Sequence, residues 1–165
     1  MKALTENEIR ASFVNCSKGE TKRLYVPLDL ATRPWDELDY LGWRDPRAPD
    51  RAYLVADVAG RPQAIALRST APSPGRKRHS MCSICLTTRA GGVALMVAPR
   101  AGRAGKQGDS VGSYLCDDLD CSLYVRGKKD PGDGARVYET LTVEEKIRRT
   151  VDNLAAFIAK VTATP

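Results

Sequence analysis

Four cysteines in two pairs are the feature that most constrains the fold of this chain. Cys82 and Cys85 form a Cys-x-x-Cys pair, and Cys116 and Cys121, with four residues between them, follow after a thirty-residue gap. A Cys-x-x-Cys turn presents two sulfurs to one metal ion, and a second pair completes the tetrahedral shell that Zn²⁺ prefers. The spacing therefore predicts one structural Zn²⁺ bound by Cys82, Cys85, Cys116 and Cys121.

A zinc ion with four protein ligands has no open position for water, so it stabilises a fold and does not activate a nucleophile. The glycines of residues 101–106 match neither the P-loop nor the Rossmann spacing. A nucleophilic triad would need a histidine, and His79, beside Ser80, is the only one in the chain. We therefore expect a binding module with no catalytic residues and no small-molecule substrate, rather than an enzyme.

Other interpretations of the cysteines are open. Two disulfides would suit a secreted protein, but no apolar signal segment follows Met1, and a fifth cysteine, Cys16, would stay unpaired. A thioredoxin-like redox role for the first pair would leave the second pair without a purpose. His79 could replace a ligand, although four cysteines already suffice. We interpret His79 as a solvated loop residue and Cys16 as an ordinary apolar residue.

The charge of the chain is uneven. Residues 61–136 hold thirteen basic and six acidic side chains, whereas residues 1–60 hold nine and ten, and residues 137–165 four and four. A basic segment around the zinc site would attract nucleic acid, an acidic protein face or a ribonucleoprotein surface. The alternative is a solubilising face. The length of 165 residues and 42% apolar content fit one domain with a genuine core, and no run predicts a membrane span. We expect a cytoplasmic protein.

The predicted fold class is α+β: a small antiparallel sheet with a four-cysteine treble-clef zinc finger and a packed C-terminal helix. A capping box at Thr5 and Glu8, followed by apolar residues at helical spacing, predicts a helix over residues 6–16. We expect residues 1–20 to be an N-terminal helical segment, and residues 21–165 to form a single α+β domain.

Alternation over residues 52–59 and 63–68, around a turn at residues 60–62, predicts a β-hairpin. Residues 93–97 and 111–115 are predicted strands on either side of a basic, irregular and mobile tip at residues 98–110. Residues 119–125 are expected to begin a short helix that presents Cys121. A Cys-x-x-Cys knuckle, a hairpin and such a helix make up a treble clef over about residues 80–127.

The remaining segments have weaker signals. Residues 33–46 are predicted to be irregular and anchored in the core by Trp35, Tyr40 and Trp43, and residues 69–80 to be a loop. Asp117, Asp118 and Asp120 are interpreted as caps of the following helix. The last helix starts at Thr142, with Glu145 completing a capping box. Its predicted apolar stripe, which should pack on the sheet, consists of Val143, Ile147, Val151, Leu154, Ile158 and Val161.

The order of these features resembles the C-terminal treble-clef zinc-finger domain of the elongation-factor-G-binding proteins, which are the FusB-type fusidic-acid-resistance proteins and their relatives. The resemblance is carried by Cys82-x-x-Cys85, the basic hairpin tip, Gly112-Ser-Tyr-Leu-Cys116-x-x-x-x-Cys121 and Ser122-Leu-Tyr-Val-Arg-Gly127. It extends from about Leu24 to the last helix. The resistance proteins of this family carry a helical bundle before the zinc domain, where this chain has one short predicted helix.

The resemblance implies a non-enzymatic protein that binds elongation factor G through its zinc finger and helps to release that factor from the ribosome. It implies the same four zinc ligands. Residues on or beside the basic tip are the candidate contacts: Arg100, Arg103, Lys106 and Tyr114. The alternative function is a zinc-stabilised module that binds ribosomal RNA or the ribosome through the same basic loop. Tyr114 and Tyr124 are the only aromatic residues near this loop that could stack on bases.

Overall fold

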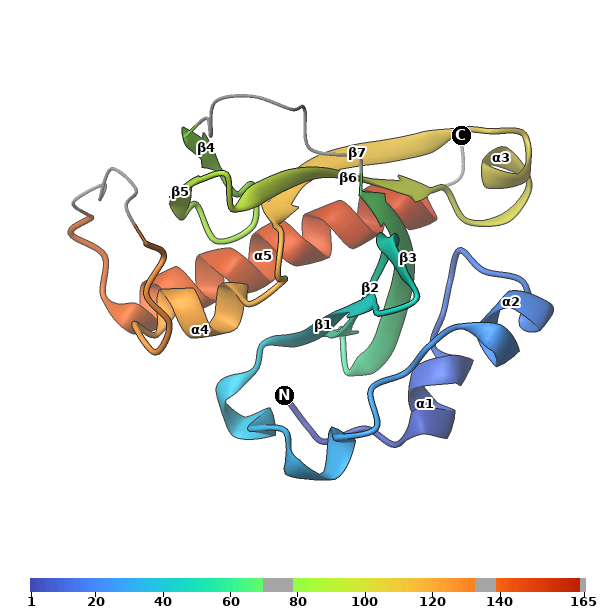
Figure 1. Ribbon diagram of the computed structural model, residues 1–165, viewed down its shortest axis with the longest axis horizontal. Coiled ribbons are helices and arrows are strands. Elements are labelled where there is room, and N and C mark those ends of the chain that lie inside the picture. Colours follow the sequence, from blue (N-terminus) through green and yellow to red (C-terminus); the bar gives the residue numbers. More distant parts are fainter. Residues whose placement is uncertain (70–78, 133–138, 164–165) are drawn as a thin grey trace.

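The computed structural model, which describes residues 1–69, 79–132 and 139–163, contains a five-stranded antiparallel sheet in the order β1-β2-β3-β6-β7 (Figure 1). A separate two-stranded sheet pairs β4 with β5. Together with the helices, these sheets confirm the predicted α+β class. The strands are β1 Tyr40–Asp45, β2 Ala48–Val58, β3 Arg61–Ser69, β4 His79–Met81, β5 Thr88–Ala90, β6 Val93–Pro99 and β7 Ser110–Cys116. Most of the loop predicted for residues 69–80 lies outside the described residues.

The predicted hairpin is formed by β2 and β3. Val58 pairs with Arg61, which leaves Ala59 and Gly60 as a two-residue turn in which both residues have positive φ angles of 53° and 78°. Two positive φ angles are typical of the turn whose twist matches that of the flanking strands. The turn is therefore tighter than predicted, because Arg61 and Pro62 already belong to β3.

Strand β1 replaces part of the predicted irregular segment. It pairs with β2 from Tyr40 opposite Ala56 to Arg44 opposite Ala52. The prediction of irregular structure over this part was wrong because a glycine interrupts the strand pattern. Gly42 is required by packing, since a Cβ atom there would lie 2.4 Å from the Cβ atom of Leu119. The three aromatic residues of this segment are buried, as predicted: Trp35, Tyr40 and Trp43.

The N-terminal segment forms two short helices, α1 Glu6–Ala11 and α2 Lys18–Arg23, each with a capping box. Helix α1 is shorter than predicted because the chain leaves it to form a parallel bridge between Phe13 and Ala64 of β3. Helix α2 was not predicted. Two 3₁₀ turns, η1 Leu30–Thr32 and η2 Trp35–Glu37, then lead into β1.

Asn15 joins the two halves of the sheet. Among the described residues, strands β3 and β6 pair at Arg68–Val97 and Ser69–Met96. Beyond these pairs, the Asn15 side-chain amide nitrogen donates to the carbonyl oxygens of Ala66 and Pro99, both at 3.0 Å, and its oxygen accepts from the Ala66 backbone nitrogen at 2.8 Å. A side-chain amide thus satisfies backbone groups where the strands separate.

The remaining helices are α3 Gly102–Lys106, α4 Cys121–Val125 and α5 Val143–Thr162. The predicted capping box of α5 is confirmed, but its buried stripe is turned relative to the prediction. Val143 and Val151 are 44% and 38% exposed, because repeated steps of four residues drift around a helix of 3.6 residues per turn. Its buried side chains are Thr150, Leu154, Phe157, Ile158 and Val161. In the part of the chain that is described, no helix could cross a membrane.

The two faces of the sheet pack against different elements. One face, which we call the zinc side, lies against α4, α5 and the four cysteines, and the opposite face, which we call the aromatic side, lies against the N-terminal segment (Figure 1). Alternate strand residues point to each face. The zinc side includes Tyr40, Leu54, Ile65 and Leu115. The aromatic side includes Leu41, Trp43, Tyr53 and Val55.

Candidate metal centre

The four cysteines are brought together from three elements. Cys82 and Cys85 lie in the turn between β4 and β5, Cys116 is the last residue of β7, and Cys121 is the first residue of α4. Strands β6 and β7 form the hairpin between the two pairs. This is the predicted treble-clef order of knuckle, hairpin and helix.

The geometry of the sulfur atoms fits Zn²⁺. All four Sγ atoms lie within 4.8 Å of one another, and the Cys82–Cys121 and Cys85–Cys116 distances are 3.7 Å and 3.6 Å. Tetrahedral Zn–S bonds of about 2.3 Å require S–S distances of about 3.8 Å. Each of the four cysteines is at most 2% exposed. The cluster is a closed four-cysteine zinc site for one ion.

The electrostatics of the cluster favour a bound cation. Hydrogen bonds from neighbouring thiols, first that of Cys116, lower the pKa of Cys82, while the pKa of Cys121 is raised well above its usual value by hydrogen bonds within the same cluster. The four groups cannot all be thiolates together without compensating charge. Zn²⁺ supplies that charge, so metal binding and thiol deprotonation are coupled.

Groups around the ligands orient the sulfurs. The backbone nitrogen of Ile84 donates to Cys82 Sγ at 3.4 Å, and Asn153 of α5 donates to the Ile84 carbonyl at 2.9 Å. Tyr40, on β1, is 3% exposed beside the cluster, and burial, followed by its interactions with Cys121, raises the pKa of its hydroxyl. Sequence reasoning interpreted Tyr40 only as a core residue. Its proximity to the metal depends on the pairing of β1, which was not predicted.

Asp118 organises a charged network over the loop between Cys116 and Cys121. Its carboxylate accepts hydrogen bonds from the Tyr124 hydroxyl, from Arg89 at 3.0 Å and from Lys129 at 3.1 Å. Burial raises the pKa of Asp118, but the hydrogen bonds from Tyr124 and the Asp120 backbone and the nearby cations outweigh it, so the pKa lies below its usual value.

The prediction that these aspartates cap the next helix was wrong. Asp120 stands at the N-cap position of α4 but makes no side-chain capping bond. Asp117 instead pairs with Arg44 of β1, and Asp118 carries the network described above. The acidic residues of this loop bind cations rather than helix N–H groups.

Comparison with known proteins agrees with this geometry. The model of the family described as the FBP C-terminal treble-clef zinc-finger matches residues 8–161. This chain belongs to that family. The solved structure of the fusidic acid resistance protein FusC is similar in fold, with a TM-score of 0.54 and 20% sequence identity over 86% of this chain. The chain spans about half, 53%, of the length of FusC. No curated protein has a significant sequence match.

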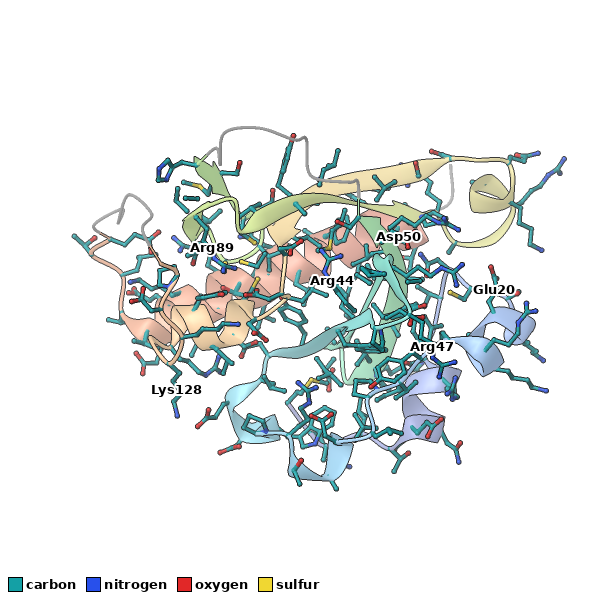
Figure 2. The ribbon with its side chains drawn as sticks, viewed as in Figure 1. Glu20, Arg44, Arg47, Asp50, Arg89 and Lys128 are labelled. Carbon is teal, nitrogen blue, oxygen red and sulfur yellow. The ribbon has the colours of Figure 1, made fainter. Side chains whose placement is uncertain are left out.

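Several cations around this FBP-type finger form ion pairs within the described residues. Arg126 makes two hydrogen bonds to Asp39, at 2.6 Å and 2.8 Å, and the Asp39 side chain is only 7% exposed. Lys128 pairs with Glu37. Figure 2 shows Lys128 and Arg89 at the α4 end of the molecule. Within the described residues, part of the positive charge counted in the sequence is therefore neutralised by ion pairs.

The hairpin tip of the finger differs from the prediction. Residues 98–110, expected to be irregular, contain the end of β6, helix α3 and the start of β7. Arg103 and Lys106 lie on α3 and are exposed. Arg100 is bound to Asp109 at 3.0 Å and to the Lys160 carbonyl of α5. Tyr114, 51% exposed, lies on β7, where its carbonyl accepts from Ser83 of the knuckle.

The residues weighed as alternative ligands lie outside the sulfur cluster. His79 is exposed on β4 rather than in a loop, and it is not among the clustered ligand atoms. Cys16 follows α1, is partly buried and is not part of the cluster. Burial, with a smaller effect of Glu20, raises the pKa of the Cys16 thiol to about 11.

Proposed function

We propose that this protein binds translation elongation factor G through the tip of its zinc finger and promotes release of that factor from the ribosome in the cytoplasm. Membership of the FBP zinc-finger family supports a binding function rather than catalysis. The structural similarity to a fusidic acid resistance protein supports the same class of protein, over about half of that protein's length. The proposal therefore concerns factor binding first and drug resistance second.

The observation that carries the proposal is the contrast between the tip and the rest of the finger. Arg103 and Lys106 make no side-chain hydrogen bond or ion pair with any residue in the described parts of the chain, whereas Arg89, Arg126 and Lys129 are all paired. Unpaired cations on the tip increase the rate of encounter with an acidic partner surface.

Arg100 and Tyr114 have different roles in the proposed interface. Arg100 holds the tip against α5 through the Lys160 carbonyl, and the Ala101 backbone nitrogen adds a second bond to the Val161 carbonyl at 2.8 Å. It therefore positions α3. Tyr114 offers an exposed ring on β7 of the kind that acts as an anchor in protein interfaces. Cations would set the association rate, and Tyr114 would slow dissociation.

The test is a binding titration between the zinc-loaded protein and purified elongation factor G at several salt concentrations, with total RNA as competitor. We expect one-to-one binding that RNA does not displace. Arg103→Ala/Lys106→Ala should weaken binding mainly through the association rate, and Tyr114→Ala should cost about 1–2 kcal/mol through dissociation.

The matched control is Arg61→Ala/Arg148→Ala, which also removes two exposed cations but away from the tip. Equal losses in the two double variants would mean that net charge, not the tip, drives binding. Failure to bind the factor, together with RNA binding whose affinity falls steeply with salt, would replace the proposal with the ribosomal RNA alternative.

A further inference from the structure

A hollow with a volume of about 530 Å³ lies between α2 and strands β2 and β3, away from the zinc ligands. This volume is within the range of small-ligand sites. Its walls combine residues from four parts of the chain, and three of these residues are arginines. The residues that matter below are Cys16, Glu20, Arg23, Arg51, Tyr53 and Arg68.

Arg51 and Arg68 are directly opposite each other on neighbouring strands. The register of the β2–β3 hairpin pairs them, so their side chains leave the same face of the sheet. Like charges in this arrangement destabilise a hairpin. The neighbouring cross-strand pairs, Ala52–Leu67 and Tyr53–Ala66, are uncharged, so they offer no negative charge to offset the two arginines. An anion between the two guanidinium groups would turn this repulsion into attraction.

The internal acceptors near these arginines are weak or already used. The Arg68 guanidinium is 3.9 Å from Asp50, and both side chains are more than half exposed, at 71% and 57%. Within the described residues, the Arg51 side chain has no hydrogen bond or ion pair. Glu20, the acidic wall of the hollow, directs its carboxylate to the Ser17 backbone and hydroxyl in the cap of α2. These hydrogen bonds, with smaller effects of Arg23 and Arg68, lower its pKa, so Glu20 compensates part of the charge of these two arginines. Figure 2 shows Glu20 on α2 and Asp50 on the sheet, on either side of this region.

A third arginine and a hydroxyl complete the site. Arg23, on the last turn of α2, donates to the Gly19 carbonyl at 3.1 Å with its Nε atom, which leaves the two terminal nitrogens of its guanidinium. Tyr53 is 5% exposed and lines the hollow, and its hydroxyl has no hydrogen bond among the residues that the structure covers. Asn15 holds the floor rigid through its three bonds to β3 and β6.

We propose that this arginine hollow binds a small anion that carries a phosphate group, such as a phosphate monoester or a diphosphate. Guanidinium groups pair with phosphate oxygens through two parallel hydrogen bonds. Arg51 and Arg68 line the hollow from the β2–β3 hairpin, and Arg23 lines it from α2. The Tyr53 hydroxyl donates to one further oxygen. The site lies outside the finger and does not depend on the proposed binding of elongation factor G.

The test is isothermal titration of the zinc-loaded protein with pyrophosphate, inorganic phosphate and adenosine diphosphate. We expect saturable one-to-one binding, tightest for a diphosphate. Arg51→Ala and Arg68→Ala should each weaken it at least about tenfold. Arg61→Ala, an exposed cation at the far end of the same hairpin, should leave it unchanged. Unchanged zinc content and a melting temperature that does not fall in the arginine variants show that the fold is intact.

Cys16 supplies an independent readout, because its thiol lines the hollow and lies outside the zinc cluster. Saturating pyrophosphate should slow alkylation of Cys16 by iodoacetamide in the native protein at least several-fold, and should not slow it in Arg51→Ala. Binding that is the same in the Arg51→Ala and Arg61→Ala variants would overturn the proposal. So would binding of a short RNA oligomer without binding of any of the three small anions.

Discussion

The zinc side and the aromatic side of the sheet are stabilised in different ways. On the zinc side, the knuckle strands β4 and β5 and helix α4 are only three to five residues long and surround a four-cysteine site. On the aromatic side, Phe13 packs edge-on against Trp43 and Tyr53, with ring centroids 6.4 Å and 5.9 Å apart. Elements too short to form a core of their own depend on a metal, whereas large side chains that bury apolar area do not.

The two sides are joined by a few identifiable contacts. Strand β1 is the main link, since Arg44 binds the Asp117 carbonyl at 2.7 Å and Gly42 packs on Leu119. Ser122 of α4 accepts from the Asp39 backbone at 3.0 Å. Loss of the metal should therefore first destabilise the zinc side, and should destabilise the aromatic side through the contacts of β1.

Removal of the metal should have the largest effect. Cys82→Ser or Cys116→Ser, or a strong chelator, removes a contribution of about 10 kcal/mol or more that zinc binding makes to folding of the finger. We expect loss of zinc, measured by metal analysis, together with a large loss of helical circular dichroism from α5, which packs on the finger. A variant that kept its zinc and its melting temperature would contradict the structural role of the site.

Tryptophan fluorescence then separates the two sides. Trp35 and Trp43, the two tryptophans of the chain, are both buried on the aromatic side. If that side is stable without the metal, their emission should remain blue-shifted after chelation and become red-shifted only on addition of denaturant. A red shift that coincides with zinc release would show that the two sides unfold as one cooperative unit. The aromatic side would then have no stability independent of the metal. Cys16→Ser is the control, because Cys16 lies outside the cluster.

The zinc side was the more predictable of the two. A Cys-x-x-Cys knuckle and a second cysteine pair limit the chain to very few arrangements, so the four ligands, the hairpin between them and helix α4 could be read directly from spacing. The β2–β3 hairpin, though not its turn, and the capping box at Thr142 were predicted from local signals of similar strength. These features depend on residues near one another in the sequence.

The features that sequence reasoning missed depend on residues far apart. Strand β1 requires a glycine at position 42 because Leu119, which lies far along the chain, packs against it. Asp118 accepts hydrogen bonds from Arg89 and Lys129, which only the folded chain brings next to it. The opposition of Arg51 and Arg68 follows from the hairpin register, which differs from the register that the predicted turn at residues 60–62 would give. Long-range packing, rather than weak local propensity, limits the prediction.

Gly42→Ala tests the link between the two sides and should have the next largest effect. The added Cβ atom would lie 2.4 Å from Leu119 Cβ, so β1 or the zinc loop must shift. Overpacking of this kind costs about 1–3 kcal/mol, measured by urea unfolding of the zinc-loaded protein. Because Leu119 lies between Cys116 and Cys121, we also expect weaker zinc affinity in competition with a chelator.

Gly19→Ala is the matched control for this substitution. Gly19 lies in α2 with no atom within 4 Å of an added Cβ, so alanine should stabilise the helix by roughly 0.5–1 kcal/mol. If Gly42→Ala destabilised the protein without lowering zinc affinity, β1 would not couple the aromatic side to the metal.

Asp118→Asn should have the smallest effect and a distinctive pH dependence. The folded-state pKa of Asp118 is lowered, so its ionised form stabilises the protein above the usual aspartate pKa of about 4, and this stability is lost as the pH falls through the folded-state value. Asparagine keeps the shape but not the charge that holds Arg89 and Lys129. We expect the free energy of unfolding to be lower than that of the wild type by about 1–2 kcal/mol at pH 7. This deficit should be constant down to about pH 5 and become smaller as acid protonates the wild-type carboxylate.

Asp152→Asn, at an exposed position of α5, is the control and should show no deficit. A deficit that persisted unchanged at the lowest pH at which both proteins still bind zinc would mean that the shape of Asp118, not its charge, supports the zinc side.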